Sequence, residues 1–202
     1  LILNSDRSRA IGVNYVEHFP ETHYFDNNDT KLNQIVANSF AGYKTVISSR
    51  SLDSKRLLVT AYKNDSPTKY FWLDLKARAG GFWFSQYPYL EGKALGKTEP
   101  FTYTARDGME LHGYLTMPAN LKEGEKPPLI IHPHGGPFGP RDNQNFDYNV
   151  QFMANLGYAV LQPNFRGSGG YGSVYQSAGY KEWGQAMQDD LYDAIAWLKQ
   201  QG

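Results

Sequence analysis

The sequence predicts an α/β protein whose first part is rich in strands and whose second part alternates strands with helices. Short runs with strand patterning, separated by polar turns, fill about the first ninety residues. From residue 129 onward, apolar runs of strand length alternate with segments of helical periodicity, an order typical of a parallel sheet. The polar, glycine-containing segment 91–100 separates these two patterns. We therefore predict two domains, residues 1–95 and residues 96–202.

Composition excludes several classes of function. The 202 residues are 41% hydrophobic and 15% aromatic, which is enough for a substantial core. The 20 Lys and Arg balance the 20 Asp and Glu without long runs of either sign, so we expect neither nucleic acid nor a membrane as a partner. The absence of cysteine excludes disulfides and thiolate metal sites, and it leaves a cytoplasmic or a periplasmic location open.

The first part should contain a short helix and a hairpin. The helix is predicted over residues 29–38, with Asp29 or Thr30 where an N-cap is expected. Its predicted apolar face comprises Leu32, Ile35 and Val36. Residues 55–62 and 70–75 have strand patterning, and the seven residues between them include Asn, Asp, Ser and Pro, which favour a turn.

The second part should open with another hairpin and continue with two strand–helix pairs. Residues 101–103 and 111–117 alternate around an Arg-Asp-Gly turn at 106–108. Strands are then predicted at 129–131 and 159–161, each followed by a loop and a helix. The first helix has an apolar stripe of Phe146, Val150, Met153 and Leu156 before a stop at Gly157, and the second has Met187, Leu191, Ala194, Ile195 and Leu198 before a stop at Gly202.

The most informative motif, His132-Pro-His-Gly-Gly-Pro137, follows the strand at 129–131. It forms a glycine turn whose bare N–H groups can face a developing negative charge. Acyl-transfer enzymes need such donors, because the tetrahedral intermediate carries its charge on one oxygen, and one positioned N–H lowers the barrier by about 3 kcal/mol. No Gly-x-Ser-x-Gly nucleophile motif occurs in the 202 residues. We therefore interpret the chain as part of a hydrolase, and its start at Leu1 without a Met leads us to expect further residues on both sides.

The glycine motif is one of four segments that follow one another along the chain. In order, these are Arg106-Asp-Gly-Met-Glu-Leu-His-Gly-Tyr-Leu115, His134-Gly-Gly-Pro137, Pro163-Asn-Phe-Arg-Gly-Ser-Gly-Gly-Tyr-Gly172, and Trp183-Gly followed by Met187-Gln-Asp-Asp-Leu191. On these motifs the chain resembles the prolyl oligopeptidase family of serine peptidases, in particular its acylaminoacyl-peptidase and dipeptidyl-aminopeptidase-like branches. The resemblance is close from about residue 100 onward, and residues 1–95 resemble more loosely the last part of a β-propeller.

The resemblance implies an α/β-hydrolase domain, of which the second domain would be the N-terminal half, in a parent that cleaves short peptides through an acyl-enzyme. In this family the Ser lies on a Gly-x-Ser-x-Gly elbow after the helix that ends here, and the Asp and His follow later. We therefore expect no catalytic triad residue in this chain, all three lying beyond Gly202, and no turnover by the chain alone. Gly136 aligns with the oxyanion-hole donor, with His134, Gly135 and Pro137 as support. The implied partners are a peptide substrate and the remainder of the same polypeptide; an oligomer stays open, and no cofactor is implied.

The glycine loop and the histidines also have simpler interpretations. A Gly-Gly-Pro loop alone is usually only a turn, but its place after a strand and beside the other motifs favours the oxyanion role for Gly136. His132 and His134 lie two apart and could share a face, as zinc ligands do, yet no third ligand is evident and we predict no metal site. We expect His134 to pack and hydrogen-bond beneath the loop.

Arg166 and the acidic residues near the end of the chain are interpreted as structural. Arg166 could pin loop carbonyls or pair with Asp189 or Asp190, and we favour this role over substrate binding. These two acids and Asp193 are expected to form the solvated, dipole-favoured start of a helix. The run 167–172 lacks the glycine spacing of a nucleotide-binding loop, so we predict no nucleotide cofactor.

Two rival functions stay open. An esterase or lipase would use the same fold, although such enzymes tend to carry Gly where this chain has Pro137. A non-catalytic β-propeller interaction module would be favoured if no nucleophile elbow followed. About twenty residues of further sequence would separate the three functions, because a strand should lead straight into that elbow.

Overall fold

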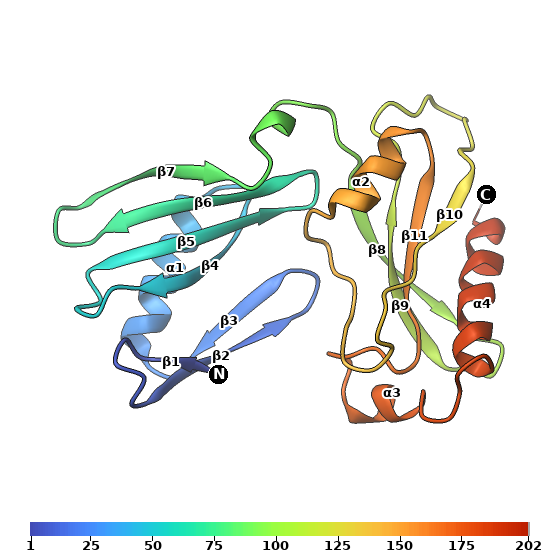
Figure 1. Ribbon diagram of the computed structural model, residues 1–202, viewed down its shortest axis with the longest axis horizontal. Coiled ribbons are helices and arrows are strands. Elements are labelled where there is room, and N and C mark those ends of the chain that lie inside the picture. Colours follow the sequence, from blue (N-terminus) through green and yellow to red (C-terminus); the bar gives the residue numbers. More distant parts are fainter. Residues whose placement is uncertain (202) are drawn as a thin grey trace. The chain divides into compact units, whose positions relative to one another are not determined.

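The computed structural model describes residues 1–201 and shows two compact units, Leu1–Lys93 (unit 1) and Ala94–Gly202 (unit 2) (Figure 1). Each unit has its own sheets and its own hydrophobic core. Strands and helices together make the protein α/β, as the sequence predicts. None of the helices in the described part is long and apolar enough to cross a membrane.

Unit 1 is built from two antiparallel sheets. The first has the order β1-β2-β3, formed by β1 (Ile2–Leu3), β2 (Ala10–Val16) and β3 (Pro20–Tyr24). The second is a meander of β4 (Lys44–Arg50), β5 (Arg56–Lys63), β6 (Ser66–Asp74) and β7 (Ala79–Ser85). A helix, α1 (Asn27–Ser39), packs Val36 against Ile47, Leu57 and Val59 of this meander. The short 3-10 helix η1 (Pro88–Leu90) follows β7.

Helix α1 begins earlier than predicted. Its N-cap is Asp26, whose extended backbone lets the carboxylate accept bonds of 2.9 Å from the N–H groups of Asn28 and Asp29. The predicted cap at Asp29 or Thr30 is therefore wrong, because the upstream aspartate already satisfies those donors. Of the predicted apolar face, Val36 is buried whereas Ile35 is 64% exposed.

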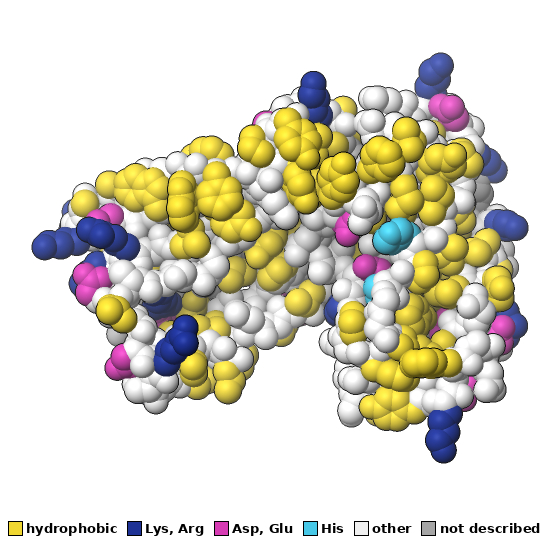
Figure 2. All heavy atoms as spheres, in the orientation of Figure 1, with side chains coloured by type: hydrophobic (Ala, Val, Ile, Leu, Met, Phe, Trp, Pro, Cys, Tyr) yellow, Lys and Arg dark blue, Asp and Glu magenta, His cyan; other side chains and the backbone are white. Residues whose placement is uncertain are grey.

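The β5–β6 hairpin is tighter than predicted. Lys63 pairs with Ser66, so the connection is the dipeptide between them, Asn64 and Asp65, and the predicted seven-residue turn is wrong. Asn and Asp suit such a turn because both tolerate unusual backbone conformations. On the neighbouring strand β7, Trp83 is 60% exposed, and Figure 2 shows hydrophobic side chains gathered over β6 and β7.

Unit 2 is a four-stranded mixed sheet with helices on both faces. Its order is β10-β11-β9-β8, formed by β8 (Thr98–Thr104), β9 (Glu110–Thr116), β10 (Leu129–Ile131) and β11 (Ala159–Asn164). Strands β10 and β11 are parallel, which confirms the alternating pattern, and the other pairs are antiparallel. The helices are α2 (Tyr148–Asn155), α3 (Ser173–Ser177) and α4 (Ala186–Gln200).

Neighbouring residues of β11 serve the two faces of this sheet. Val160 packs with Val150 and Ala154 of α2, whereas Leu161 belongs to a cluster with Tyr175 of α3 and residues of α4. This follows from the period of two in a strand, which turns successive side chains to opposite faces. The sheet therefore lies between two helical layers, and the ends of β10 and β11 meet at the same edge.

The predicted apolar stripes hold for α4 and only partly for α2. In α4, Met187 and Ala194 are buried, and Leu191, Ile195 and Leu198 are half-buried. Helix α2 covers Tyr148–Asn155, so Phe146 precedes it and Leu156 is a C-cap that is 61% exposed. Gln151 is buried instead, because its side-chain amide bonds to both the N–H and the carbonyl of Gly96, at 2.9 Å and 2.7 Å. The predicted stop at Gly202 lies outside the described residues.

Candidate functional site

The His132–Pro137 loop leaves the sheet at the end of β10. The His132 N–H donates to the Leu161 carbonyl on β11 at 2.8 Å, which anchors the start of the loop. Gly136 has φ +131°, a conformation that L side chains rarely adopt. A Cβ added there would lie 3.0 Å from two atoms of the Pro140 ring and 3.2 Å from the Phe138 nitrogen. Both backbone conformation and space therefore require glycine at position 136.

The peptide N–H groups of Gly135 and Gly136 find no hydrogen-bond acceptor within residues 1–201. Both glycines line a shallow, mainly apolar depression of about 390 Å³ in unit 2. Its other lining residues are Pro133, His134, Pro137, Phe165, Trp183, Gly184, Met187, Gln188 and Leu191. Gly135 and Gly136 are both exposed, so their N–H groups are open to an incoming carbonyl oxygen.

His134 is held from both sides of its ring. Its Nδ1 lies 2.9 Å from the Gly135 carbonyl oxygen, and its Nε2 lies 2.7 Å from the hydroxyl of Ser168. One face of the ring stacks on Phe165, with centroids 4.6 Å apart. The histidine therefore links the glycine loop to the segment that follows β11.

A serine and a histidine at 2.7 Å have the separation of a nucleophile and its base, yet the surroundings of Ser168 do not suit that chemistry. The Ser168 side chain is fully buried, and its hydroxyl also lies 2.7 Å from the Phe165 carbonyl. The distal nitrogen of His134 contacts a backbone carbonyl, where a triad has a carboxylate. A substrate carbonyl could not reach this hydroxyl, so the contact between Ser168 and His134 is structural.

The segment 165–170 lies directly against the glycine loop. The Gly169 N–H donates to the Pro140 carbonyl at 3.0 Å, and a Cβ on Gly169 would lie 2.0 Å from the Gly139 carbonyl oxygen. A Cβ on Gly167 would lie 3.2 Å from the Phe138 ring. This contact between the two loops was not predicted from the sequence. The run of glycines at 167–170 could have indicated it, because backbones approach this closely only where side chains are absent.

Arg166 is a structural residue with two carboxylate partners. Its backbone N–H and its guanidinium bond to Asp190 at 2.8–3.1 Å, and Nη1 donates to Asp107 at 2.7 Å. Asp190 is fully buried, so the predicted solvated acidic cluster is wrong for this residue. The reason is that the first turn of α4 faces the loop after β11. Of the two predicted partners, Asp190 pairs with Arg166, and Asp189 instead lies 3.0 Å from Arg106.

The charges of this ion pair shift the pKa values of its members. Hydrogen bonds that its guanidinium donates to Asp190 raise the pKa of Arg166 despite partial desolvation. Burial raises the pKa of Asp190, and the bonds from Arg166 oppose that rise. The Arg166 guanidinium lowers the pKa of Asp107. The arginine thus stays charged and holds the loop after β11 to the start of α4.

His132 belongs to no metal site that the structure reveals. Within residues 1–201, no group of three or more His, Asp or Glu side chains is arranged to hold a metal ion. Asp142 lies near both loop histidines: burial raises the pKa of its carboxyl, and its interaction with His134 and His132 opposes that rise.

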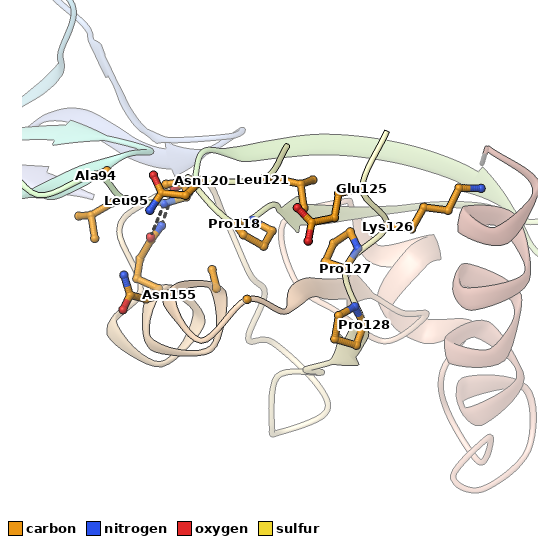
Figure 3. Close-up of a pocket in the computed structure, with 15 residues that line it drawn as sticks. Ala94, Leu95, Pro118, Asn120, Leu121, Glu125, Lys126, Pro127, Pro128 and Asn155 are labelled. Atoms are coloured by element: carbon orange, nitrogen blue, oxygen red, sulfur yellow. Dashed lines mark hydrogen bonds between the residues drawn. The ribbon is translucent and has the colours of Figure 1, made fainter. Parts of the chain in front are cut away.

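A second cavity in unit 2, of about 200 Å³, is lined by the start of the unit, the connection 118–128 and helix α2 (Figure 3). Gln151 and Gly96, which share two hydrogen bonds, are among its lining residues. Glu125 and Lys126 are its ionisable lining residues. No predicted site residue lines it, so the chemistry argued from the sequence belongs to the glycine loop.

Comparison with known proteins shows which family the chain resembles. The model of the Prolyl oligopeptidase family matches residues 144–202. Dipeptidyl aminopeptidase BIII of Pseudoxanthomonas mexicana is 38% identical over 162 residues, which are 77% of this chain and 23% of that protein. The chain belongs to the prolyl oligopeptidase family.

Two further comparisons extend this result, one to the whole sequence and one to the fold. Dipeptidyl peptidase family member 6 of Caenorhabditis elegans is 30% identical over the whole chain, which corresponds to 30% of that protein. The solved structure of a Mycobacterium tuberculosis puromycin-hydrolyzing peptidase matches with a TM-score of 0.63 and 25% identity, over 74% of this chain and 23% of that one. The chain therefore spans about a quarter of the length of the relatives it matches.

Proposed function

We propose that this chain is the part of a serine peptidase that supplies the oxyanion loop, with the Gly136 N–H as the donor. The observation that carries the proposal is this N–H group, which has no acceptor within residues 1–201 and lies in a loop that only glycine can form. When a serine attacks a peptide carbonyl, charge builds on the carbonyl oxygen, and a positioned N–H stabilises it by about 3 kcal/mol. The Ser, Asp and His would come from residues beyond Gly202.

We also propose the domain assignment that the family resemblance implies. Residues 1–95 would be the C-terminal part of a β-propeller, and residues 96–202 the N-terminal half of an α/β-hydrolase domain. The four-stranded antiparallel meander β4–β7 supports the first assignment, since propeller blades are four-stranded sheets. The glycine loop at the carboxyl end of a parallel strand supports the second.

The proposed substrates are short peptides. Two relatives are named as dipeptidyl peptidases and a third as a puromycin-hydrolyzing peptidase, and these names support cleavage of an amide near a free amino terminus. Beyond the substrate, the proposed partner of this chain is the remainder of its own polypeptide. No cofactor is part of the proposed reaction.

Replacement of Gly136 tests this function in the full-length protein. We expect Gly136→Val to lower kcat for a dipeptidyl p-nitroanilide by about a hundredfold, with a smaller change in KM, because a mis-aimed donor is lost mainly from the charged intermediate. Gly124→Val is the matched control: Gly124 also has a positive φ (+77°), and a Cβ there meets nothing within 4 Å.

The same assay separates the rival functions. A wild-type protein that cleaves p-nitrophenyl esters but no p-nitroanilide would be an esterase. Cleavage of neither would favour an interaction module. An unchanged kcat in a correctly folded Gly136→Val protein would remove Gly136 from the mechanism.

A further inference from the structure

We infer that Ser168 is a positioning residue for the oxyanion loop and acts through His134. The inference rests on the proposed role of Gly136. Ser168 lies in the segment after β11, 34 residues from His134 in sequence, with its Oγ 2.7 Å from the ring Nε2. Because Ser168 is fully buried, it cannot touch a substrate. Any effect of its hydroxyl on the reaction must pass through the groups that it contacts.

The contact with Gly135 indicates which ring nitrogen of His134 carries a hydrogen. Its Nδ1 lies 2.9 Å from the Gly135 carbonyl oxygen, which can only accept, so Nδ1 carries a hydrogen. In the neutral ring Nε2 then has a lone pair, and the Ser168 hydroxyl donates to it at 2.7 Å instead of donating to the Phe165 carbonyl. In the protonated ring Nε2–H donates to the Ser168 oxygen, and the hydroxyl turns to the Phe165 carbonyl, also 2.7 Å away. In both states Nδ1–H stays on the Gly135 carbonyl.

The Gly135 carbonyl and the Gly136 N–H belong to one peptide unit. This unit is planar and trans, so a bond that orients the carbonyl also orients the N–H, in the opposite direction. A peptide between two glycines rotates easily, because neither neighbour has a Cβ to restrict it. The bond from His134 is therefore what aims the proposed oxyanion donor.

Loss of the Ser168 hydroxyl would release this constraint. The His134 ring would then lose its anchor at Nε2 and could turn away from the Gly135 oxygen. Ser168 itself is well fixed, because its N–H donates to Phe165 O at 3.0 Å and the next N–H, of Gly169, donates to Pro140 O at 3.0 Å. The serine is thus part of a hydrogen-bonded support for the glycine loop.

A double-mutant cycle in the full-length protein tests this inference. Ser168→Ala should lower kcat for the p-nitroanilide about tenfold and leave KM within about twofold, because the loss falls on the transition state. His134→Asn keeps an N–H donor at the position of Nδ1 but does not reach Ser168. In that background Ser168→Ala should cause no further loss of kcat. Ser168→Thr, which keeps a hydroxyl in the otherwise wild-type protein, should retain most of the wild-type kcat.

The control is Ser177→Ala, which removes an exposed hydroxyl that bonds only locally, to Val174 O, and should leave kcat unchanged. Equal losses of kcat from Ser168→Ala in both backgrounds, or no loss in either, would overturn the inference.

Crystal structures of the wild-type and Ser168→Ala proteins provide a readout that needs no turnover. In the variant we expect the His134 Nδ1 and Gly135 O atoms to separate beyond about 3.5 Å, outside hydrogen-bonding range, and the Gly135–Gly136 peptide to rotate. An unchanged peptide would overturn the inference even if the wild-type protein hydrolysed no substrate. A rotated peptide in a wild-type protein without hydrolase activity would instead overturn only the proposed function.

Discussion

Arg166 and Asp190 bring two full charges into the interior of unit 2, with side chains 9% and 0% exposed. Their bonds satisfy a backbone N–H as well as the guanidinium, so the pair replaces the water that both groups lose on folding. Asp107 adds a third charge at the rim, with its side chain 49% exposed. At this scale, stability depends on which carboxylate is buried and much less on how many there are.

The pair therefore predicts a sharp contrast between neighbouring aspartates. Asp190→Asn should lower the free energy of unfolding by about 3–5 kcal/mol, because it leaves the Arg166 charge buried without its main partner. Asp189→Asn, whose side chain is 43% exposed and contacts Arg106, should cost less than about 1 kcal/mol. Urea unfolding of the full-length protein would measure both, and equal midpoints would contradict the ion-pair assignment.

Between elements, the contact of the two glycine loops decides the geometry of the site. The segment 165–170 and the loop after β10 touch through backbone atoms, since Gly169 N donates to Pro140 O and its Cα faces the Gly139 carbonyl. Helix α4 holds the same segment from its other side through Asp190. The loops after β10 and β11 are thus parts of one support, which the parallel pairing of these strands brings together.

Gly169→Ala should separate these loops. A Cβ at 2.0 Å from a backbone oxygen forces the backbone to move, so we expect both a lower unfolding midpoint and a lower kcat. Gly172→Ala is the matched comparison: Gly172 has φ +94° but open space around a Cβ, so it should cost only the backbone strain of about 1 kcal/mol. Similar effects of the two variants on kcat would show that the loop contact does not shape the site.

Sequence periodicity predicted the elements better than the contacts between them. The strands β10 and β11 and the stripe of α4 follow from local patterns of period two and 3.6. The bond between His134 and Ser168 joins residues 34 apart, and although pairing of Arg166 with Asp189 or Asp190 was predicted, the burial of Asp190 depends on this arginine 24 residues away. No local window contains such pairs. The Asp26 cap was missed for a different reason, because the run of Asp, Asn and Thr at 26–30 offers several candidate caps and only the backbone conformation selects among them.

For the whole molecule, the proposed chemistry lies in unit 2, and the serines near its glycine loop are not placed as nucleophiles. Ser168 is the serine bonded to the loop histidine, and it is buried. Ser173 and Ser177 lie on the short helix α3, with no strand-to-helix elbow to aim their hydroxyls at a base. A reactive serine is thus expected elsewhere in the full-length protein.

Labelling with a fluorophosphonate probe tests this most directly, because the probe reacts only with a serine that a neighbouring base activates. The full-length protein should be labelled, and peptide mapping should place the adduct on a serine that follows Gly202. Ser168, Ser173 and Ser177 should stay unmodified, and the isolated 202-residue chain should not react. An adduct on any serine between Leu1 and Gly202, and on Ser168 above all, would contradict the proposal that this chain supplies the oxyanion loop and not the nucleophile.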